Sequence, residues 1–318
     1  MILLKHMDAM DFVKEIETES VNCIICDPPF GISEDMFDKH YARDKSFVMK
    51  GYQTAPSSNE DYYEWACKWI HEFPRILKKD GTAYIVCAWN HLCDIENAIR
   101  SSGKLEVVNH IIWKYNFGVY TKNKFVTSHY HILRVAIKGG KPFFNNLAYF
   151  DEKEKTNTGH SAQYADMEDV WFIQKEYAQG EKKNINKLPN ALVEKMLKYS
   201  TKYGDVVCDL FMGNFTTAYV SIQLGRKVIG CEINEEACKE HIPLIEKLKF
   251  PEMNEIPQSK TTKKPKNAGK KITEDEMKKI ETRYNELTGT KKSKIETLEK
   301  EFDRGHFSIV NILKKLGH

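Results

Sequence analysis

The sequence predicts an α/β fold in which an open sheet carries helices on both faces, followed by a small all-α module. Two stretches support this prediction. Val21–Cys26 is a short apolar run typical of a buried strand, and it must end at Asp27-Pro28-Pro29-Phe30 because proline cannot continue a central strand. Residues 206–232 follow the order strand, loop, helix and strand, with an acid about 20 residues after the loop, which is typical of a nucleotide-binding crossover.

Length and composition favour one large core with an appendage. The chain has 318 residues, of which 41% are hydrophobic and 29% charged. No apolar run approaches the ~18 residues that span a membrane, and the first residues predict a strand rather than a secretory signal. The eight cysteines are scattered, as is usual in a reducing cytoplasm. Cys23 and Cys26 have metal-pair spacing, but residues three apart on a strand point to opposite faces, so we expect no metal.

The charge is unevenly distributed along the chain. From Pro251 to the end there are 16 Lys and Arg against 11 Asp and Glu, whereas the preceding residues carry 32 against 34. Residues 256–273 hold six lysines and no acid. A basic tail on a near-neutral body favours a polyanionic partner.

Hydrophobic spacing and breaker residues predict the remaining elements. Trp65, Trp69 and Phe73 recur every four residues, so we expect a helix that buries this stripe in the core. Asn59 would cap that helix, and Pro74 would kink it near its end. Asp80-Gly81 predicts a turn. The pattern also predicts strands over 1–6, 82–89, 105–115, 131–138, 206–209 and 227–231, and helices over 11–17, 191–199 and 218–224.

A separate helical domain is predicted over 273–318, after a basic linker over 251–272. Thr273 and Glu276 have the spacing of a capping box, and three segments with helical apolar spacing follow. The tight turn before the last of them resembles a helix-turn-helix module, in which His306, Ser308 and Asn311 would face the major groove of DNA. The alternative is a small helical bundle used for dimer contacts.

Asp27-Pro28-Pro29-Phe30 resembles motif IV of the amino methyltransferases, which transfer a methyl group from S-adenosylmethionine (SAM) to an exocyclic nitrogen of a DNA base. The resemblance implies that Asp27 and the Pro28 carbonyl accept hydrogen bonds from the target amino group, with the two prolines fixing the backbone. Phe30 would stack on the flipped base, which offsets part of its unstacking energy. A ring amine is a poor nucleophile, so its lone pair must be localised and held in line with the methyl group.

The βαβ unit resembles motif I of SAM-dependent methyltransferases. The resemblance implies that Asp209 helps to hold the amino-acid part of SAM, that Gly213 lets the backbone approach it, and that Glu232 accepts hydrogen bonds from the ribose. Asp8 matches an acid that contacts the adenine, and it is equally suited to cap a helix. The implied cofactor residues are Asp8, Ala9, Asp27, Lys187, Asn190, Asp209, Phe211, Gly213, Asn214, Thr216, Thr217, Glu232 and Ile233.

The chain departs from the family pattern at several of these positions. Leu210, Asn214 and Phe215 stand where the family has Pro, Ser and Gly. A large ring in place of the second glycine would crowd the cofactor if it pointed towards it. Leu188 separates Lys187 from the following proline, whereas the family usually has Lys directly before Pro.

Motif IV precedes motif I in this chain, which is the circularly permuted order of the β group of DNA amino methyltransferases. The resemblance covers about residues 1–250 and implies a Rossmann-like class I methyltransferase sheet. It also implies a target-recognition insert over about 116–180, with the loop 31–58 contributing. Lys122 and Lys124 fall in this basic and aromatic insert and are candidate DNA contacts.

The implied activity is methylation of the adenine N6 amino group, because Asp before Pro-Pro is more usual in adenine enzymes of the family. Two alternatives remain: N4-cytosine methylation, and a DNA-binding protein whose methyltransferase fold has lost activity. We expect SAM as cofactor, double-stranded DNA as partner and no membrane. A homodimer and a cognate restriction enzyme are further partners consistent with the resemblance, in a cytoplasmic, nucleoid-associated protein of a bacterium or phage.

Overall fold

The computed structural model describes residues 2–31, 55–115, 122–145, 167–174, 187–253, 267 and 271–318. Large parts of the predicted loop 31–58, insert 116–180 and linker 251–272 lie outside these residues. Among the described residues, no helix is both long and apolar enough to cross a membrane.

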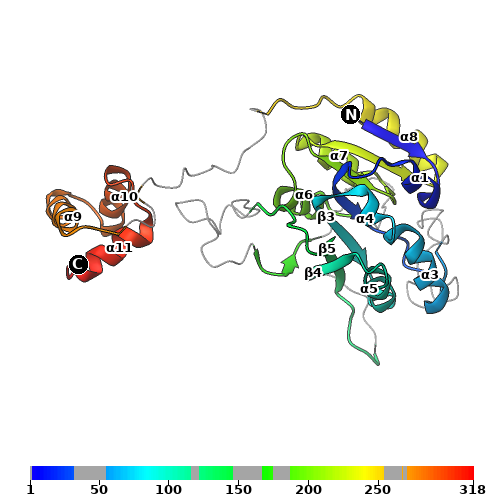
Figure 1. The fold of residues 1–318 in the computed structure, drawn as a ribbon, viewed down its shortest axis with the longest axis horizontal. Helices are drawn as coiled ribbons and strands as arrows, with labels where there is room; N and C mark the ends of the chain where they lie inside the picture. Colours follow the sequence, from blue (N-terminus) through cyan, green and yellow to red (C-terminus); the bar gives the residue numbers. More distant parts are fainter. Residues whose placement is uncertain are drawn as a thin grey trace.

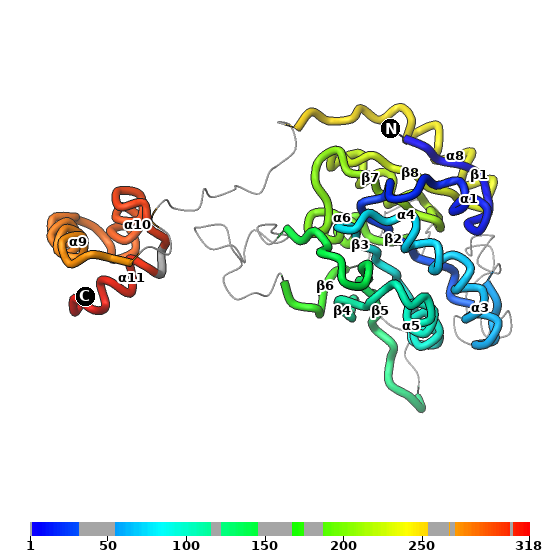
Figure 2. Tube along the Cα trace, in the orientation of Figure 1, coloured from blue at the N-terminus to red at the C-terminus, as the bar shows by residue number. Residues whose placement is uncertain are grey.

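One eight-stranded sheet organises the main domain, and its strand order is β1-β8-β7-β2-β3-β5-β4-β6. The strands are β1 (Ile2–His6), β2 (Val21–Cys26), β3 (Leu77–Cys87), β4 (Leu105–Lys114), β5 (His129–Ile137), β6 (Val170–Phe172), β7 (Val206–Asp209) and β8 (Lys227–Glu232). The run from β1 to β3 is parallel, and β5 is antiparallel to both β3 and β4. β1, from the start of the chain, lies alongside β8, from the far end of the domain (Figure 2).

Helices cover both faces of the sheet, as predicted (Figure 1). One face carries α1 (Ala9–Glu15), α3 (Asn59–Ile70), α4 (Phe73–Ile76) and α5 (Leu92–Ser101); the other carries α6 (Asn190–Ser200), α7 (Thr216–Gln223) and α8 (Glu235–Glu246). The alternating side chains of β2 illustrate the division, since Cys26 packs with the first group and Cys23 with the second. The two cysteines therefore point to opposite faces, as their spacing predicted.

The aromatic stripe of α3 is confirmed as core, because Trp69 and Phe73 are fully buried. Two details of the prediction for this region are wrong. Ser58, not Asn59, caps α3. The helix ends at Ile70, and Pro74 lies near the start of the separate short helix α4. Backbone N–H groups in the first turn have no partner within the helix, so proline removes no hydrogen bond there.

Asp80-Gly81 does not form the predicted turn but lies inside β3, which begins at Leu77 and ends at Cys87 rather than at Trp89. The pairing of β3 with β2 shifts register here, so the extra residues form a bulge. A side chain at Gly81 would meet the Lys78 carbonyl oxygen at 2.9 Å. The Asn22 carbonyl oxygen of β2 would lie 3.2 Å from the same Cβ atom, so the close approach of the two strands requires glycine here.

The range predicted as the target-recognition insert contains two strands of the sheet. β5 lies between β3 and β4, with Ile132 and Leu133 fully or almost fully buried, and β6 pairs with β4. Residues 129–137 therefore belong to the scaffold. Most of the remaining residues of the predicted insert lie outside the described ranges.

The C-terminal residues form the three predicted helices, α9 (Glu274–Glu286), α10 (Lys291–Glu301) and α11 (His306–Lys315), around a small apolar cluster that includes Ile280 and Leu298. Thr273 caps α9 by accepting the Glu276 N–H at 3.2 Å, as the sequence predicted. Arg304, only 4% exposed, donates to both Glu276 carboxylate oxygens at 2.6 and 2.8 Å. This bidentate pair ties the turn before α11 to the start of α9.

Candidate active site

Four carboxylates lie at the carboxyl ends of neighbouring parallel strands. Asp209 and Glu232 are the last residues of β7 and β8, Asp27 directly follows β2, and Asp8 follows β1. β7 continues through α7 to β8 on one side, whereas β2 continues through α3 and α4 to β3 on the other. The chain thus reverses its winding direction between β7 and β2, which is where open α/β sheets bind their ligands.

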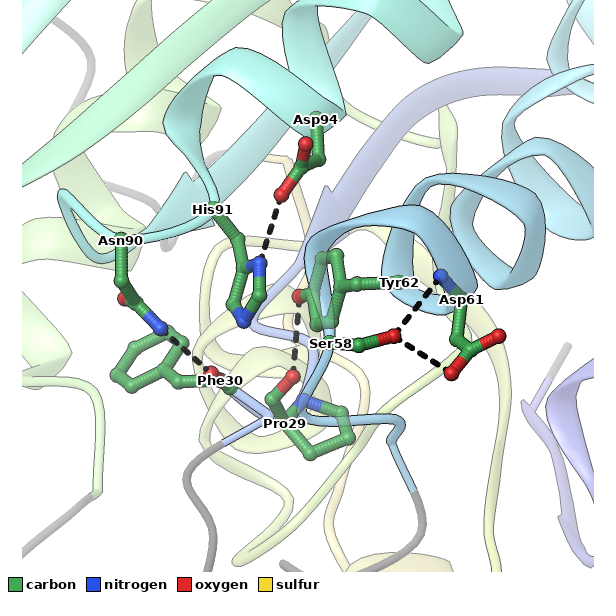
Figure 3. Close-up of polar contacts among 8 residues, drawn as sticks. All are labelled: Pro29, Phe30, Ser58, Asp61, Tyr62, Asn90, His91 and Asp94. Carbon is green, nitrogen blue, oxygen red and sulfur yellow. Dashed lines mark hydrogen bonds and ion pairs between the residues drawn. The ribbon is translucent and has the colours of Figure 1, made fainter. Parts of the chain in front are cut away.

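The backbone of the Asp-Pro-Pro-Phe segment is held from two sides (Figure 3). Tyr62 of α3 donates its hydroxyl to the Pro29 carbonyl oxygen at 3.0 Å, and the Asn90 side-chain amide donates to the Phe30 carbonyl oxygen at 3.1 Å. The Pro28 carbonyl contacts no hydrogen-bond donor in the described part of the chain. The Pro29 and Phe30 carbonyls therefore already accept hydrogen bonds, whereas the Pro28 carbonyl, next to Asp27, remains available to accept one from a ligand.

Tyr62 is in turn fixed by its surroundings. Its ring is fully buried and stacks on the His91 ring, with centroids 3.8 Å apart and planes 7° from parallel. The His91 Nδ1 lies 2.7 Å from an Asp94 carboxylate oxygen. Burial, with Cys87, Asp27 and Asp94 nearby, raises the pKa of the Tyr62 phenol, so the hydroxyl keeps its proton and remains a donor.

Gly31 closes the segment in the left-handed region, at φ +57°. A Cβ here would lie 2.3 Å from the Pro56 carbonyl oxygen and 2.9 Å from His91 Nε2. Only glycine allows this conformation together with this packing, so the segment is rigid on both sides of its aromatic residue.

Phe30 itself is only 6% exposed, and its ring lies 5.2 Å from the Tyr130 ring at a tilt of 38°. Tyr130 in turn contacts Trp113 and Tyr115, at 5.5 and 5.3 Å between centroids. The ring predicted to stack on a base is thus one member of an aromatic cluster at the ends of β2, β4 and β5.

The motif I residues are joined by backbone hydrogen bonds. Asp209 accepts the Phe211 N–H at 2.9 Å, and burial raises the pKa of its carboxyl to about 7 against the hydrogen bonds from Thr217 and Phe211. Glu232 accepts the Gly213 N–H at 2.7 Å, and burial likewise raises its pKa. Glu232, at the end of β8, therefore contacts the glycine loop after β7. This contact brings the two motif I elements close enough to bind one ligand together.

The residues present fit a SAM-like ligand. Gly213 adopts φ +51°, and a Cβ there would meet no described atom nearer than the Phe211 carbonyl oxygen at 4.0 Å. Open space therefore adjoins its backbone. Ile233, which follows Glu232, is 42% exposed and offers an apolar surface beside the acid. Asp8 caps α1 by accepting the Met10 N–H at 2.8 Å, so the structural role of this residue is confirmed.

The ring of Phe215 does not point into this space. Phe215 adopts φ +59°, the left-handed conformation, and caps α7. Its fully buried ring packs among α7, α8 and β8, with neighbours including Met212, Val228 and Cys238, and lies 5.6 Å from the His241 ring. The crowding of the cofactor that a ring in place of glycine suggested is therefore absent.

The other residues predicted for the cofactor site differ in how deeply they are buried. Thr216 and Thr217 are buried at the start of α7, and Ala9 is buried at the start of α1. Asn190 is exposed at the first position of α6. Burial lowers the pKa of His241 on α8, and the charge of exposed Lys187 adds a smaller lowering, so Lys187 lies on the α8 side. Among the predicted DNA contacts, Lys122, Lys124 and Asn311 are exposed and Ser308 is partly exposed.

Sequence reasoning missed Tyr62, Asn90, His91 and Tyr130. Asn90 and His91 carried a signal, since polar residues directly after a buried strand lie at the same edge as Asp27. Tyr62 carried none, because its bond to Pro29 joins residues 33 positions apart.

Comparison with known proteins identifies related sequences over most of the main domain. The N6_N4_Mtase family model, described as DNA methylase, matches residues 21–247. Type II methyltransferase M2.DpnII of Streptococcus pneumoniae is 29% identical over 241 residues, covering 75% of this chain and 87% of the relative. DNA adenine methyltransferase YhdJ of Escherichia coli (strain K12) is 30% identical over 252 residues, covering 74% of this chain and 79% of the relative.

Solved structures share the fold. The PvuII DNA methyltransferase, described as cytosine-N4-specific, superposes with a TM-score of 0.58 at 14% identity, covering 77% of this chain and 86% of its own. The complex of M1.HpyAVI with SAM gives a TM-score of 0.50 at 21% identity, covering 75% of this chain and 97% of the M1.HpyAVI chain. These likenesses support the predicted α/β fold of the main domain.

Proposed function

The chain belongs to the N6_N4_Mtase family of DNA methylases, and from this premise we propose that it methylates the N6 amino group of adenine in a specific sequence of double-stranded DNA. It is a SAM-dependent DNA methyltransferase of the β group. Two observations favour adenine: Asp27 precedes the two prolines, and a relative at 30% identity is named a DNA adenine methyltransferase.

The observation that carries the proposal is the state of the three carbonyls in the Asp-Pro-Pro-Phe segment. Tyr62 and Asn90 occupy those of Pro29 and Phe30, while that of Pro28 has no donor within the described residues. We assign the Asp27 carboxylate and the Pro28 carbonyl as paired acceptors for the two hydrogens of the target amine. Both bonds localise the nitrogen lone pair and orient it for attack.

Bound SAM supplies an electrophilic methyl group on its sulfonium. In our proposal Asp209 and Gly213 hold its amino-acid part and Glu232 its ribose, with Asp8, Ala9 and Ile233 beside the adenine. In the same proposal Phe211, Asn214, Thr216 and Thr217 shape the loop, and Lys187 and Asn190 are further cofactor contacts. Phe30 and its neighbour Tyr130 offer a flipped base an aromatic surface.

DNA binding is assigned to surfaces outside the sheet. We propose that Lys122 and Lys124 contact the phosphate backbone and that α11 presents His306, Ser308 and Asn311 to DNA, as a domain separate from residues 1–250. If α9–α11 do not bind DNA, they are proposed as a homodimer contact. A cognate restriction enzyme and a cytoplasmic location near the nucleoid follow from the bacterial type II relatives as further proposals.

Mass spectrometry of nucleosides tests the proposal directly. Unmethylated duplex DNA incubated with the chain and SAM should gain N6-methyladenine. Asp27→Ala should abolish this product while SAM affinity is retained, and Asp11→Ala, which removes an exposed acid of α1, should leave it unchanged. N4-methylcytosine as the product would replace adenine by cytosine in the proposal. DNA binding without any product would indicate an inactive member of the family.

A further inference from the structure

A cavity lies away from the strand edge that carries Asp27. Its volume is about 240 Å³, and it is formed between α6 and the half of the sheet made by β3, β4, β5 and β6. Two buried cations line it: Arg134 of β5 is 6% exposed and Lys195 of α6 is 5% exposed. Burying a guanidinium whose N–H groups lack partners is costly, so the position of Arg134 in this cavity needs a physical reason.

Arg134 is incompletely paired. Its Nη1 donates to the Asn109 side-chain oxygen at 3.3 Å, and its guanidinium carbon lies 5.0 Å from the Phe144 ring centre. Its Nε and Nη2 are buried and make no direct hydrogen bond to a described residue, although the Tyr84 hydroxyl lies near the guanidinium. The Lys195 ammonium lies 5.0 Å from the Trp171 ring centre. Nε and Nη2 form the fork that binds a phosphate or carboxylate through two parallel hydrogen bonds.

The cavity is distinct from the candidate active site. Arg134 lies three residues along β5 from His131, which pairs with Cys87 at the end of β3. Three residues of strand set it back from the edge by about 10 Å. Its side chain also lies on the face covered by α6, whereas Tyr62 and His91 belong to the α3 and α5 side.

We propose that this cavity binds the phosphate group of a small phosphorylated sugar or nucleotide, with the phosphate on Arg134. The volume lies just below the roughly 300–1,000 Å³ of sites for drug-sized ligands, which suits a ligand of this size. Glu168 and Asp169 line the exposed rim, where their carboxylates accept hydrogen bonds from sugar hydroxyls. The same carboxylates repel additional phosphates, so a free monophosphate suits the cavity better than a DNA strand does.

Isothermal titration calorimetry on the whole chain tests the proposal with inorganic phosphate, ribose 5-phosphate and ribose. We expect saturable binding of both phosphates and none of ribose. Arg134→Met keeps the apolar stem of the side chain and should weaken phosphate binding at least about tenfold, which is 1.4 kcal/mol. Arg100→Met removes an arginine that is 73% exposed on α5 and should leave phosphate binding unchanged.

A second measurement covers the case in which Arg134→Met perturbs the fold. Phosphate should raise the thermal midpoint of the wild-type chain but not that of Arg134→Met, while both retain SAM binding. Equal phosphate affinity in the two chains, or no phosphate binding by the wild type, would overturn the proposal. Duplex affinity identifies the source of the phosphate: an unchanged value in Arg134→Met supports a free ligand, and a parallel loss supports a DNA phosphate in the same cavity.

Discussion

The hydroxyl of Tyr62 is the sharpest point at which to perturb the candidate site. Tyr62→Phe removes one oxygen and keeps the ring that stacks on His91 at 3.8 Å. The Pro29 carbonyl loses its donor at 3.0 Å, and a buried hydrogen bond of this kind contributes about 1 kcal/mol. In a domain of this size that loss lowers the thermal midpoint by about 2–4 °C.

The effect on turnover should be larger than the effect on stability. The Pro28 carbonyl adjoins the released residue, and a displacement of about 1 Å in a reacting assembly costs up to roughly a hundredfold in rate. We expect kcat of Tyr62→Phe to fall about 10- to 100-fold while the Kd for SAM is unchanged. Steady-state methylation of duplex DNA at saturating SAM measures kcat, and calorimetry measures the Kd for SAM.

Tyr63→Phe provides the matched control, because Tyr63 is the next residue on α3 and is only partly buried. Its kcat should equal that of the wild type. If Tyr62→Phe retained full kcat, or if its loss of rate were matched by an equal loss of SAM affinity, the hydrogen bond to Pro29 would not position the segment.

Two further predictions concern motif I. The pKa of Asp209 in the fold, about 7, lies above the ordinary value of 3.8, so the native state binds this proton more tightly and stability falls as pH rises from about 4 to 7. Asp209→Asn should remove up to about 4 kcal/mol of this pH-dependent loss in the free energy of unfolding. Urea unfolding of the variant and the wild type between about pH 4 and 7 measures the difference. An unaltered pH profile would contradict the shifted pKa. Phe215→Gly should relieve about 1 kcal/mol of left-handed strain but lose about 3–5 kcal/mol of ring burial, giving a net destabilisation with unchanged SAM affinity. Tighter SAM binding in that variant would show that the ring does obstruct the cofactor.

The elements nearest the candidate site could be predicted from the sequence because their signals are local. β2 and β7 have the predicted bounds, since short apolar runs end at proline or at an acid with little ambiguity. The same applies to the cap of α9, where Thr273 and Glu276 lie within one turn. The position of the carboxylates at one edge then follows from the rules for parallel sheets.

The failures have a different physical origin. Asp80-Gly81 has the chemistry of a turn, but pairing with β2 holds it in a bulge of β3, so a long-range ladder overrides a local preference. The direction of the Phe215 ring depends on a single left-handed residue, which sequence spacing does not reveal. The bond from Tyr62 to Pro29 depends on how α3 docks on the sheet.

The strand order also determines when the protein can complete its folding during synthesis. β2 is made early, but its neighbour β7 follows some 180 residues later, which at ribosomal rates of about 5–20 residues per second is a delay of roughly 10 to 40 s. Throughout this interval one edge of β2 has no strand beside it, and β1 waits still longer for β8. The nascent chain therefore exposes unpaired strand edges, which can pair with other chains, until its last two strands emerge.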